Sequence, residues 1–282
     1  MRSKLRVFVS VDMEGITGIV NWQQVSRREP DYKQALELMI GDVNAAVRGA
    51  LDGGADDVLV NDAHDMMANL PLAQLHPRAR LISGFAKPLG MMQGVDGADV
   101  AMFVGYHARM GTPHAILDHT LYGAAFNRVW LGETEVGEVE LNAVLAGHFR
   151  VPVVLVTGDA TVCRAAESFI GDWVTTAAVK QPVSKTAAEC LHPQVAQAAI
   201  QAAAAQALQR ASIANPVRVD PPVRLRVELK DTEMADITSL CPFVEQLDGR
   251  TIQLLGDTVL AAYRRLEVVG LLSTVPALIR KL

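Results

Sequence analysis

Residues 7–15 read VFVSVDMEG, an apolar run rich in β-branched side chains that ends in two carboxylates and a glycine. Two later stretches repeat the arrangement, since residues 58–64 read VLVNDAH and residues 100–107 read VAMFVGYH. Short apolar runs bounded by turn residues are typical of buried parallel strands. Ligands of open α/β sheets lie beyond the carboxyl ends of such strands. We therefore expect the acidic and histidine side chains after these runs to share one site.

The segments between the runs carry a helical pattern. Apolar residues at helical spacing predict a helix over 32–51, which Gly53 and Gly54 would end. Strand, helix and strand over residues 6–61 then form a right-handed βαβ unit. The pattern predicts an α/β fold with a mostly parallel sheet flanked by helices. Further elements are expected as a short strand or turn at 80–84, strands at 151–156 and 175–179, a hairpin turn at 132–135, and helices at 138–149 and 160–170.

The character of the sequence changes near residue 185. An Ala- and Gln-rich stretch follows, and its residues favour a helix. Beyond it, residues 223–229 alternate apolar and charged side chains, which is typical of a half-exposed strand. We expect a metal-binding catalytic α/β domain over 1–185 and a smaller C-terminal α/β domain over 186–282. The elements expected in the second domain are helices at 195–211 and 257–272 and strands at 223–229 and 251–255.

The composition limits the class of protein. Half of the 282 residues are apolar, which is enough for a sizeable core, and the formal net charge of −5 argues against binding to nucleic acid. No stretch approaches the ~20 apolar residues that span a membrane. The three cysteines are widely spaced, and the first residues do not have the pattern of a signal peptide. These features predict a cytoplasmic protein with reduced thiols and no membrane partner.

The residues after the three runs suit a metal. Asp12 and Glu14 are two positions apart, so both carboxylates can face one side, while His64 and His107 supply imidazoles. Carboxylates and imidazoles without thiolates suit zinc, and also manganese or iron. Two divalent ions would be neutralised by Asp12, Glu14, one further carboxylate and a bridging hydroxide. Each residue alone also has an ordinary explanation, as a turn cap or a core histidine, but three such strand ends together favour a metal site.

Several motifs resemble those of the zinc-dependent D-aminopeptidase family (DppA-like metallopeptidases), and they follow one another in order through most of the first ~185 residues. They are SVDMEGITG at 10–18, VNDAH at 60–64, LHP at 75–77, ISG at 82–84, VGYHA at 104–108, GE with LNA at 137–143, and TAAVK at 176–180. The resemblance implies that two zinc ions per subunit, with manganese or cobalt as substitutes, are held by Asp12, Glu14, His64, His107 and Glu138. Without the resemblance, Glu138 would be read as a favourable charge in the first turn of a helix.

The resemblance also implies one essential histidine outside the metal ligands, and it falls on His119. Its role is either that of a nucleophile or that of an acid–base group. We favour acid–base chemistry, because histidine titrates near the working pH. Family members often have a small residue at the position of Asp118, which is a minor departure here.

The function implied is that of a dinuclear zinc aminopeptidase acting on short peptides or amides with a free N-terminus, such as D-Ala-D-Ala. Assembly into a decamer of two pentamer rings is implied as well. Three alternatives stay open at this point: another dimetal amidohydrolase or L-dipeptidase, a haloacid-dehalogenase-like phosphatase, and a non-catalytic shell protein. His64 and His107 argue against the phosphatase, which uses a magnesium site built from carboxylates.

Overall fold

The three apolar runs form neighbouring strands at the centre of a seven-stranded sheet. The computed structural model describes residues 4–280. The strand order of this first sheet is β3-β2-β1-β4-β7-β8-β9, and every neighbouring pair is parallel except β8 and β9. The expected mostly parallel sheet is therefore confirmed. Its strands are β1 (Arg6–Val11), β2 (Asp57–Asp62), β3 (Ala79–Ile82), β4 (Val100–Tyr106), β7 (Val153–Asp159), β8 (Thr175–Ser184) and β9 (Ala187–Cys190).

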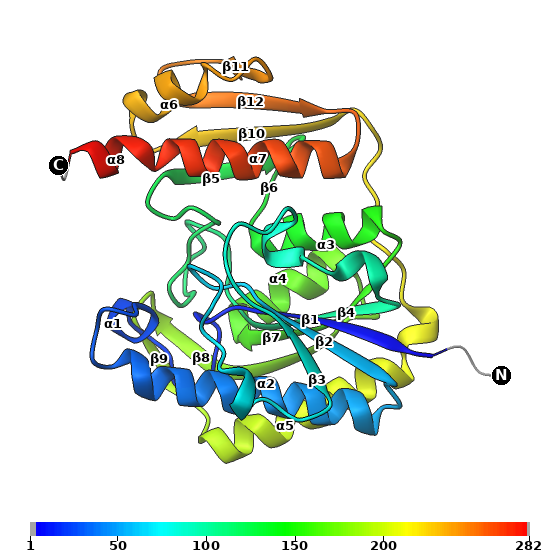
Figure 1. The fold of residues 1–282 in the computed structure, drawn as a ribbon. Helices are drawn as coiled ribbons and strands as arrows, with labels where there is room; N and C mark the ends of the chain where they lie inside the picture. Colours follow the sequence, from blue (N-terminus) through cyan, green and yellow to red (C-terminus); the bar gives the residue numbers. More distant parts are fainter. Residues whose placement is uncertain (1–3, 281–282) are drawn as a thin grey trace.

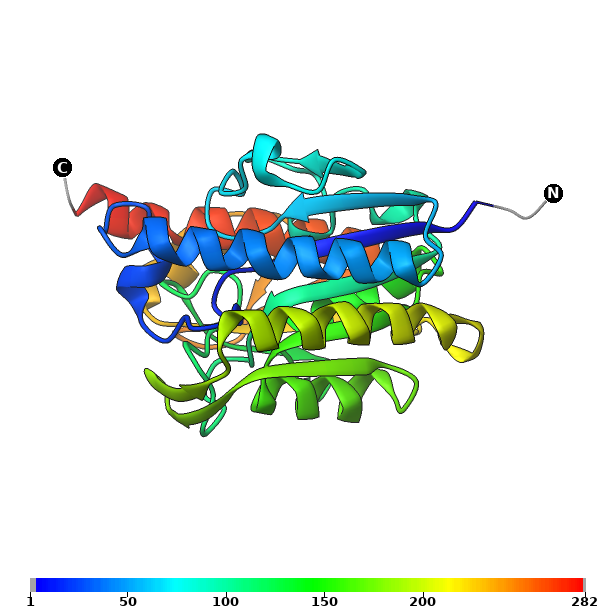
Figure 2. The same ribbon diagram turned by 90° about the horizontal axis from the view of Figure 1, so that it is seen from below.

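Helices cover both faces of the first sheet (Figure 1). On one face, α2 (Tyr32–Asp52) and α5 (Pro193–Gln209) lie side by side, as Figure 2 shows. The two helices approach closely, because a Cβ atom at Gly49 would lie 2.2 Å from the carbonyl oxygen of Gln201. The other face carries α3 (Glu138–His148) and α4 (Ala160–Ile170). The short helical segments are α1 (Trp22–Val25), η1 (Leu72–Gln74), η2 (Gly90–Met92), η3 (Val95–Gly97) and η4 (Ala211–Ile213).

A second, antiparallel sheet lies beyond α3 (Figure 1), in the strand order β11-β12-β10-β5-β6. The long helix α7 packs against this sheet and also contacts α3. The side chains of β10 alternate between buried and more exposed, as the sequence predicts for residues 223–229. The elements of this layer are β5 (Phe126–Leu131), β6 (Thr134–Glu135), β10 (Val223–Leu229), β11 (Val244–Gln246), β12 (Thr251–Gly256), α6 (Thr232–Thr238), α7 (Val259–Ser273) and α8 (Val275–Ile279).

One apolar core joins the two sheets. It contains Phe103 of the first sheet, Leu145 of α3, Val227 of the second sheet and Leu266 of α7. A separate core fills the space between the first sheet and the α2–α5 pair. The division into units 1–185 and 186–282 stays a prediction, and elements cross it in both directions. The β5–β6 hairpin pairs with β10, and α5 packs on α2.

Local capping explains most of the differences between expected and observed helix ends. The predicted helix at 195–211 begins earlier, because His192 caps it and Pro193 fits its first turn. The predicted helix at 257–272 begins at Val259, because the Thr258 hydroxyl accepts a hydrogen bond from the Ala261 amide. No helix within residues 4–280 combines the length and the apolar composition that a membrane-spanning helix requires.

Candidate metal centre

The carboxyl ends of β2, β1 and β4 meet at one edge of the first sheet. Val11 pairs in register with Asp62 on one side and with Val104 on the other. The segments that follow these strands therefore lie together, and the amide of Asp12 donates a hydrogen bond to the carbonyl of Val104 at 2.9 Å. This register brings Asp12, His64 and His107 to one place, although they are far apart in the chain.

Asp12 lies between the two histidines. Its Oδ1 is 3.2 Å from Nδ1 of His64, and its Oδ2 is 3.3 Å from Nε2 of His107. Glu14 approaches the same nitrogen of His64 at 3.1 Å, and Glu138 approaches the same nitrogen of His107 at 3.3 Å. All five side chains are buried. The donors thus fall into two groups, with Asp12 at their junction.

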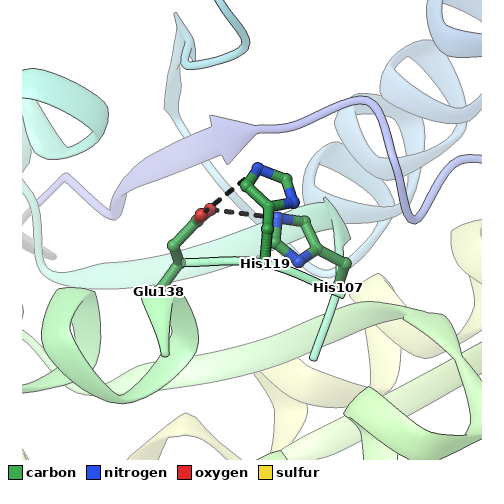
Figure 3. Close-up of side chains that lie close together, drawn as sticks. All are labelled: His107, His119 and Glu138. Atoms are coloured by element: carbon green, nitrogen blue, oxygen red, sulfur yellow. Dashed lines mark ion pairs between the residues drawn. The ribbon is translucent and has the colours of Figure 1, made fainter. Parts of the chain in front are cut away.

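The two groups have the arrangement expected of metal sites. Ligand atoms of Asp12, Glu14 and His64 lie within 4.8 Å of one another, and so do those of a second group, which is formed by His107, His119 and Glu138. Figure 3 shows the second group, in which the carboxylate of Glu138 faces both imidazole rings. The structure therefore brings together all five predicted ligands and the predicted acid–base histidine.

Three buried atoms at the centre fit a metal better than they fit the protein around them. Within residues 4–280, Oδ2 of Asp12, Oε2 of Glu14 and Nε2 of His107 are buried and have no hydrogen-bond partner. Leaving such a group unsatisfied costs about 1–3 kcal/mol, and more when the group is charged. A divalent cation that accepts oxygen and nitrogen donors would satisfy all three atoms.

Backbone carbonyls orient the two histidines for such a role. Nε2 of His64 contacts the carbonyl of Val25 at 2.9 Å, and Nδ1 of His107 contacts the carbonyl of Ala108 at 3.0 Å. If each of these nitrogens donates its proton to the carbonyl, the other nitrogen keeps its lone pair toward the carboxylates. Each imidazole is then held in the tautomer that a metal ligand needs.

Charge coupling within the centre is strong. Burial alone would lower the pKa of His64 and of His107, but the negative charge of Glu14 or Glu138 and contact with Asp12 raise both pKa values well above the ordinary range. Burial likewise disfavours the charged form of Asp12, but its contacts with the two imidazoles outweigh burial and hold its pKa well below the usual range. Both imidazoles therefore favour the protonated form more than an ordinary histidine does.

Zinc binding is accordingly expected to release protons and to be tighter at about pH 8 than at about pH 6. Zinc affinity is expected to rise with pH because the metal-free histidines have raised pKa values and must lose protons before they can bind a metal. Calorimetric titration with zinc in buffers of different ionisation enthalpy measures the protons released. Replacing His64 with alanine should reduce this number, whereas the same change at the exposed His148 should leave it unchanged. A proton release of zero would contradict the expectation.

Glu138 reaches the centre because α3 begins there. Its Oε1 accepts a hydrogen bond from the amide of Leu121 at 2.6 Å, and its Oε2 faces His107. The first turn of a helix also favours a carboxylate electrostatically. Glu138 can therefore act both as a favourable charge at the start of α3 and as a metal ligand. For this reason the residue pattern alone does not identify Glu138 as a ligand.

Lys180 is a functional candidate that sequence reasoning missed. Its ammonium group is fully buried and donates hydrogen bonds to the carbonyls of Glu14, Ile16 and Ile19 at 2.7, 2.8 and 2.5 Å. Burial lowers its pKa to about 8. Lys180 thereby fixes the loop that carries Glu14. The feature of the sequence that could have indicated this role is the position of the lysine directly after the apolar run 175–179.

His119 lies in the segment between β4 and β5 and is less buried than the five predicted ligands. Its Nδ1 lies 2.9 Å from the carbonyl of Leu117, which leaves Nε2 directed toward Oε1 of Glu138 at 3.8 Å. The ring stacks on His107, with centroids 4.1 Å apart. The neighbouring Asp118 pairs with Lys185 at 2.9 Å. The unusual carboxylate at position 118 is therefore engaged outside the centre.

A cavity of about 830 Å³ opens onto the centre. Asp12, Glu14 and Glu138 lie in its wall together with His119, and apolar side chains that include Trp22 and Phe85 form other parts of the wall. Pockets of this size, largely apolar with a few convergent polar groups, are typical of small-ligand sites. The cavity has room for a short peptide.

Other polar residues near the centre have structural partners. Asp62 binds the amides of Asn69 and Leu70, so it braces the loop after His64. Lys87 donates hydrogen bonds to Asn61 and to the carbonyl of Asp62. Asn142 is fully buried and hydrogen-bonds to the phenols of two tyrosines, Tyr106 and Tyr263.

Replacing Gly123 with alanine is expected to lower kcat by about a hundredfold, the cost typical of a 1 Å misplacement in an active site. A Cβ atom at Gly123 would lie 2.8 Å from Cδ2 of His119, so the ring must move. Steady-state kinetics with a peptide substrate measures the change. Alanine at Gly97, where a Cβ would meet nothing within 4 Å, is the matched control. Wild-type kcat in both variants would show that the position of the His119 ring is unimportant.

A mostly parallel α/β sheet with buried carboxylates and imidazoles at its carboxyl edge, facing a cavity, is the architecture of a metal-dependent hydrolase. A sequence profile of the D-aminopeptidase family matches residues 5–268. The chain therefore belongs to this family and is an aminopeptidase, a hydrolase of peptide bonds.

Two known proteins support the assignment. A D-aminopeptidase of Bacillus subtilis (strain 168) is 36% identical over 269 residues, which cover 94% of this chain and 96% of the relative. A solved structure, described as the Zn-dependent D-aminopeptidase DppA from Bacillus subtilis, a self-compartmentalizing protease, matches with a TM-score of 0.92. It is 35% identical, and the match covers 96% of this chain and 98% of that chain. The fold is therefore that of a D-aminopeptidase.

Proposed function

We propose that the chain is a dinuclear zinc aminopeptidase that removes the first residue from short D-amino-acid peptides such as D-Ala-D-Ala. The observation that carries this proposal is the pair of donor groups, with Asp12 in contact with a histidine of each, and the unpartnered buried atoms among them. The similarity to a Zn-dependent D-aminopeptidase supports the choice of metal and of substrate. Asp12, Glu14 and His64 would hold one ion, and His107 and Glu138 the other, with Asp12 shared.

The protein's own residues would bind and orient the reactants. Zinc, when bound, supplies Lewis acidity toward the scissile carbonyl and makes a nearby water more acidic. His119 would take a proton from the attacking water and return it to the leaving amine, since its Nε2 is directed into the centre while its Nδ1 contacts the Leu117 carbonyl. Trp22, which packs edge-on against the His119 ring with centroids 5.7 Å apart, would restrict its rotation.

Amine release from D-Ala-D-Ala and from L-Ala-L-Ala by the zinc-loaded protein tests the proposal, with the metal content measured on the same sample. Selective cleavage of the D,D peptide with about two zinc ions per chain is the expected result for a two-metal site. Cleavage of the L,L peptide alone would preserve the dimetal mechanism and refute D-specificity. One ion per chain in a fully active sample would refute the dinuclear centre.

We further propose that the chain forms a homo-oligomer, a decamer of two pentamer rings. The description of the similar solved protein as self-compartmentalizing supports this assembly. Light scattering coupled to size exclusion is the direct test. A monomer at micromolar concentration would contradict the proposal and leave the catalytic part untouched.

A further inference from the structure

Glu267 contributes a carboxylate to the cavity from outside the candidate metal centre. It lies on α7, in the second layer of the molecule, yet it lines the same cavity as Asp12, Glu14 and Glu138. It belongs to neither of the two donor groups found among the described residues. The proposed chemistry gives it no task, so its presence in the cavity wall requires its own explanation.

The surrounding residues are shaped around this carboxylate. The phenol of Tyr122 donates a hydrogen bond to Oε2 of Glu267 at 3.0 Å. Glycines leave room for both partners. A Cβ atom at Gly90 would lie 2.9 Å from Oε1 of Glu267, and one at Gly270 would lie 2.0 Å from the ring of Tyr122. The pair of Tyr122 and Glu267 therefore occupies a defined position and not a mobile surface site.

No cationic side chain of the described residues pairs with the carboxylate of Glu267. Across residues 4–280, no lysine, arginine or histidine nitrogen comes within 4.0 Å of its carboxylate oxygens, and its hydrogen-bond donor Tyr122 is a neutral phenol. Burial raises the pKa of Glu267, and the negative charge of Glu138 acts in the same direction. Carboxylates removed from water are normally paired with a cation. A cation that entered the cavity would supply the missing partner.

One short loop connects Glu267 to the candidate metal centre. The amide of Leu121 donates to Oε1 of Glu138 at 2.6 Å, and the next residue, Tyr122, donates to Glu267. In an aminopeptidase substrate, the ammonium nitrogen is two bonds away from the scissile carbonyl carbon. The group that binds this nitrogen must therefore lie near the reacting end of the cavity, and Glu267 shares the cavity wall with Glu138.

We propose that Glu267 binds the N-terminal ammonium group of the substrate and so selects peptides with a free N-terminus. The inference rests on the proposed aminopeptidase function and adds to it a residue that determines specificity. The phenol of Tyr122 acts as a positioning group that holds one oxygen of the carboxylate at the cavity wall. Peptides with an acylated or hydroxyl-substituted N-terminus lose this contact.

The test compares two substrates that differ only in the amine. The zinc-loaded wild-type enzyme and the E267Q variant are assayed with D-Ala-D-Ala and with D-lactoyl-D-alanine, in which a hydroxyl replaces the ammonium group. The preference for the amine, as a ratio of kcat/KM values, should fall about 10- to 100-fold in E267Q, the loss expected for one charge-assisted hydrogen bond. Glu267→Asp should keep part of the preference. Glu245→Gln, on the exposed strand β11, should keep all of it.

A binding measurement separates this inference from the proposed function. Ligand-observed NMR on the zinc-free protein compares D-alaninamide with propionamide, the same molecule without its amine. Binding of D-alaninamide in preference to propionamide, lost in E267Q, supports the ammonium site even if neither peptide is cleaved. Equal binding of the two probes to the wild-type protein overturns the proposal. So does an E267Q variant that loses activity on both substrates to the same extent, which would give Glu267 a structural role only.

Discussion

Replacing His119 with alanine is expected to lower kcat by about 10²- to 10⁴-fold, the contribution of a general acid–base group, while the zinc content stays at the wild-type level. The reason is the position of the ring. His119 is less buried than the predicted ligands, contacts the cavity, and directs Nε2 toward Glu138 at 3.8 Å. Steady-state kinetics and elemental analysis of the same sample give both quantities.

A loss of zinc in the His119 variant would also be informative, because His119 lies in one donor group with His107 and Glu138. A variant that loses one zinc ion together with its activity would identify His119 as a metal ligand. A variant with normal kcat would exclude both roles. Alanine at the exposed His148 is the matched control and should change neither kcat nor metal content.

Replacing Asp12 with asparagine should remove both zinc ions and reduce hydrolysis by more than the 10–100-fold that is typical of changes outside the inner ligand shell. Asp12 faces His64 with one oxygen and His107 with the other, so it touches both donor groups. Loss of its negative charge weakens both sites at once. Elemental analysis after dialysis against zinc-free buffer measures the effect.

A second buried aspartate gives the control for Asp12. Asp42 is 1% exposed, accepts hydrogen bonds from the amide and hydroxyl of Thr17, and belongs to neither donor group. Asp42→Asn should change stability without changing metal content. Equal metal loss in both variants would show that any buried substitution in this region disturbs the centre. Retention of one full zinc ion by Asp12→Asn would contradict a shared role for Asp12.

The candidate ligands that the sequence predicts best are those directly after strands. Asp12, His64 and His107 follow apolar runs whose pairing is parallel and whose ends must coincide, so strand physics alone places them together. Glu138 could be identified as a ligand only through the resemblance to a family, because a carboxylate in the first turn of a helix is common for electrostatic reasons. The match to the D-aminopeptidase family rules out the phosphatase alternative.

Residues that contact the site from elements distant in the chain could not be predicted from the sequence. Lys180, on β8, contacts the loop at Glu14 although β4 and β7 separate β8 from β1 in the sheet. Glu267 reaches the cavity only because α7 packs against α3. Local patterns predicted the strand at 223–229 and the turn at 132–135, but not their union in one sheet. Such pairings depend on long-range packing, which periodicity does not encode.

The separation of the ligand-bearing segments along the chain has a consequence for the order of events in folding. Asp12 and Glu14 are the only two of the five candidate ligands that are near neighbours in sequence, and the others follow at His64, His107 and Glu138. An unfolded chain would have to close several long loops to gather them, and each closure carries an entropic cost. We therefore expect the sheet to form first. Metal would then stabilise the finished fold without nucleating it, and a chelator would act on the native state by mass action.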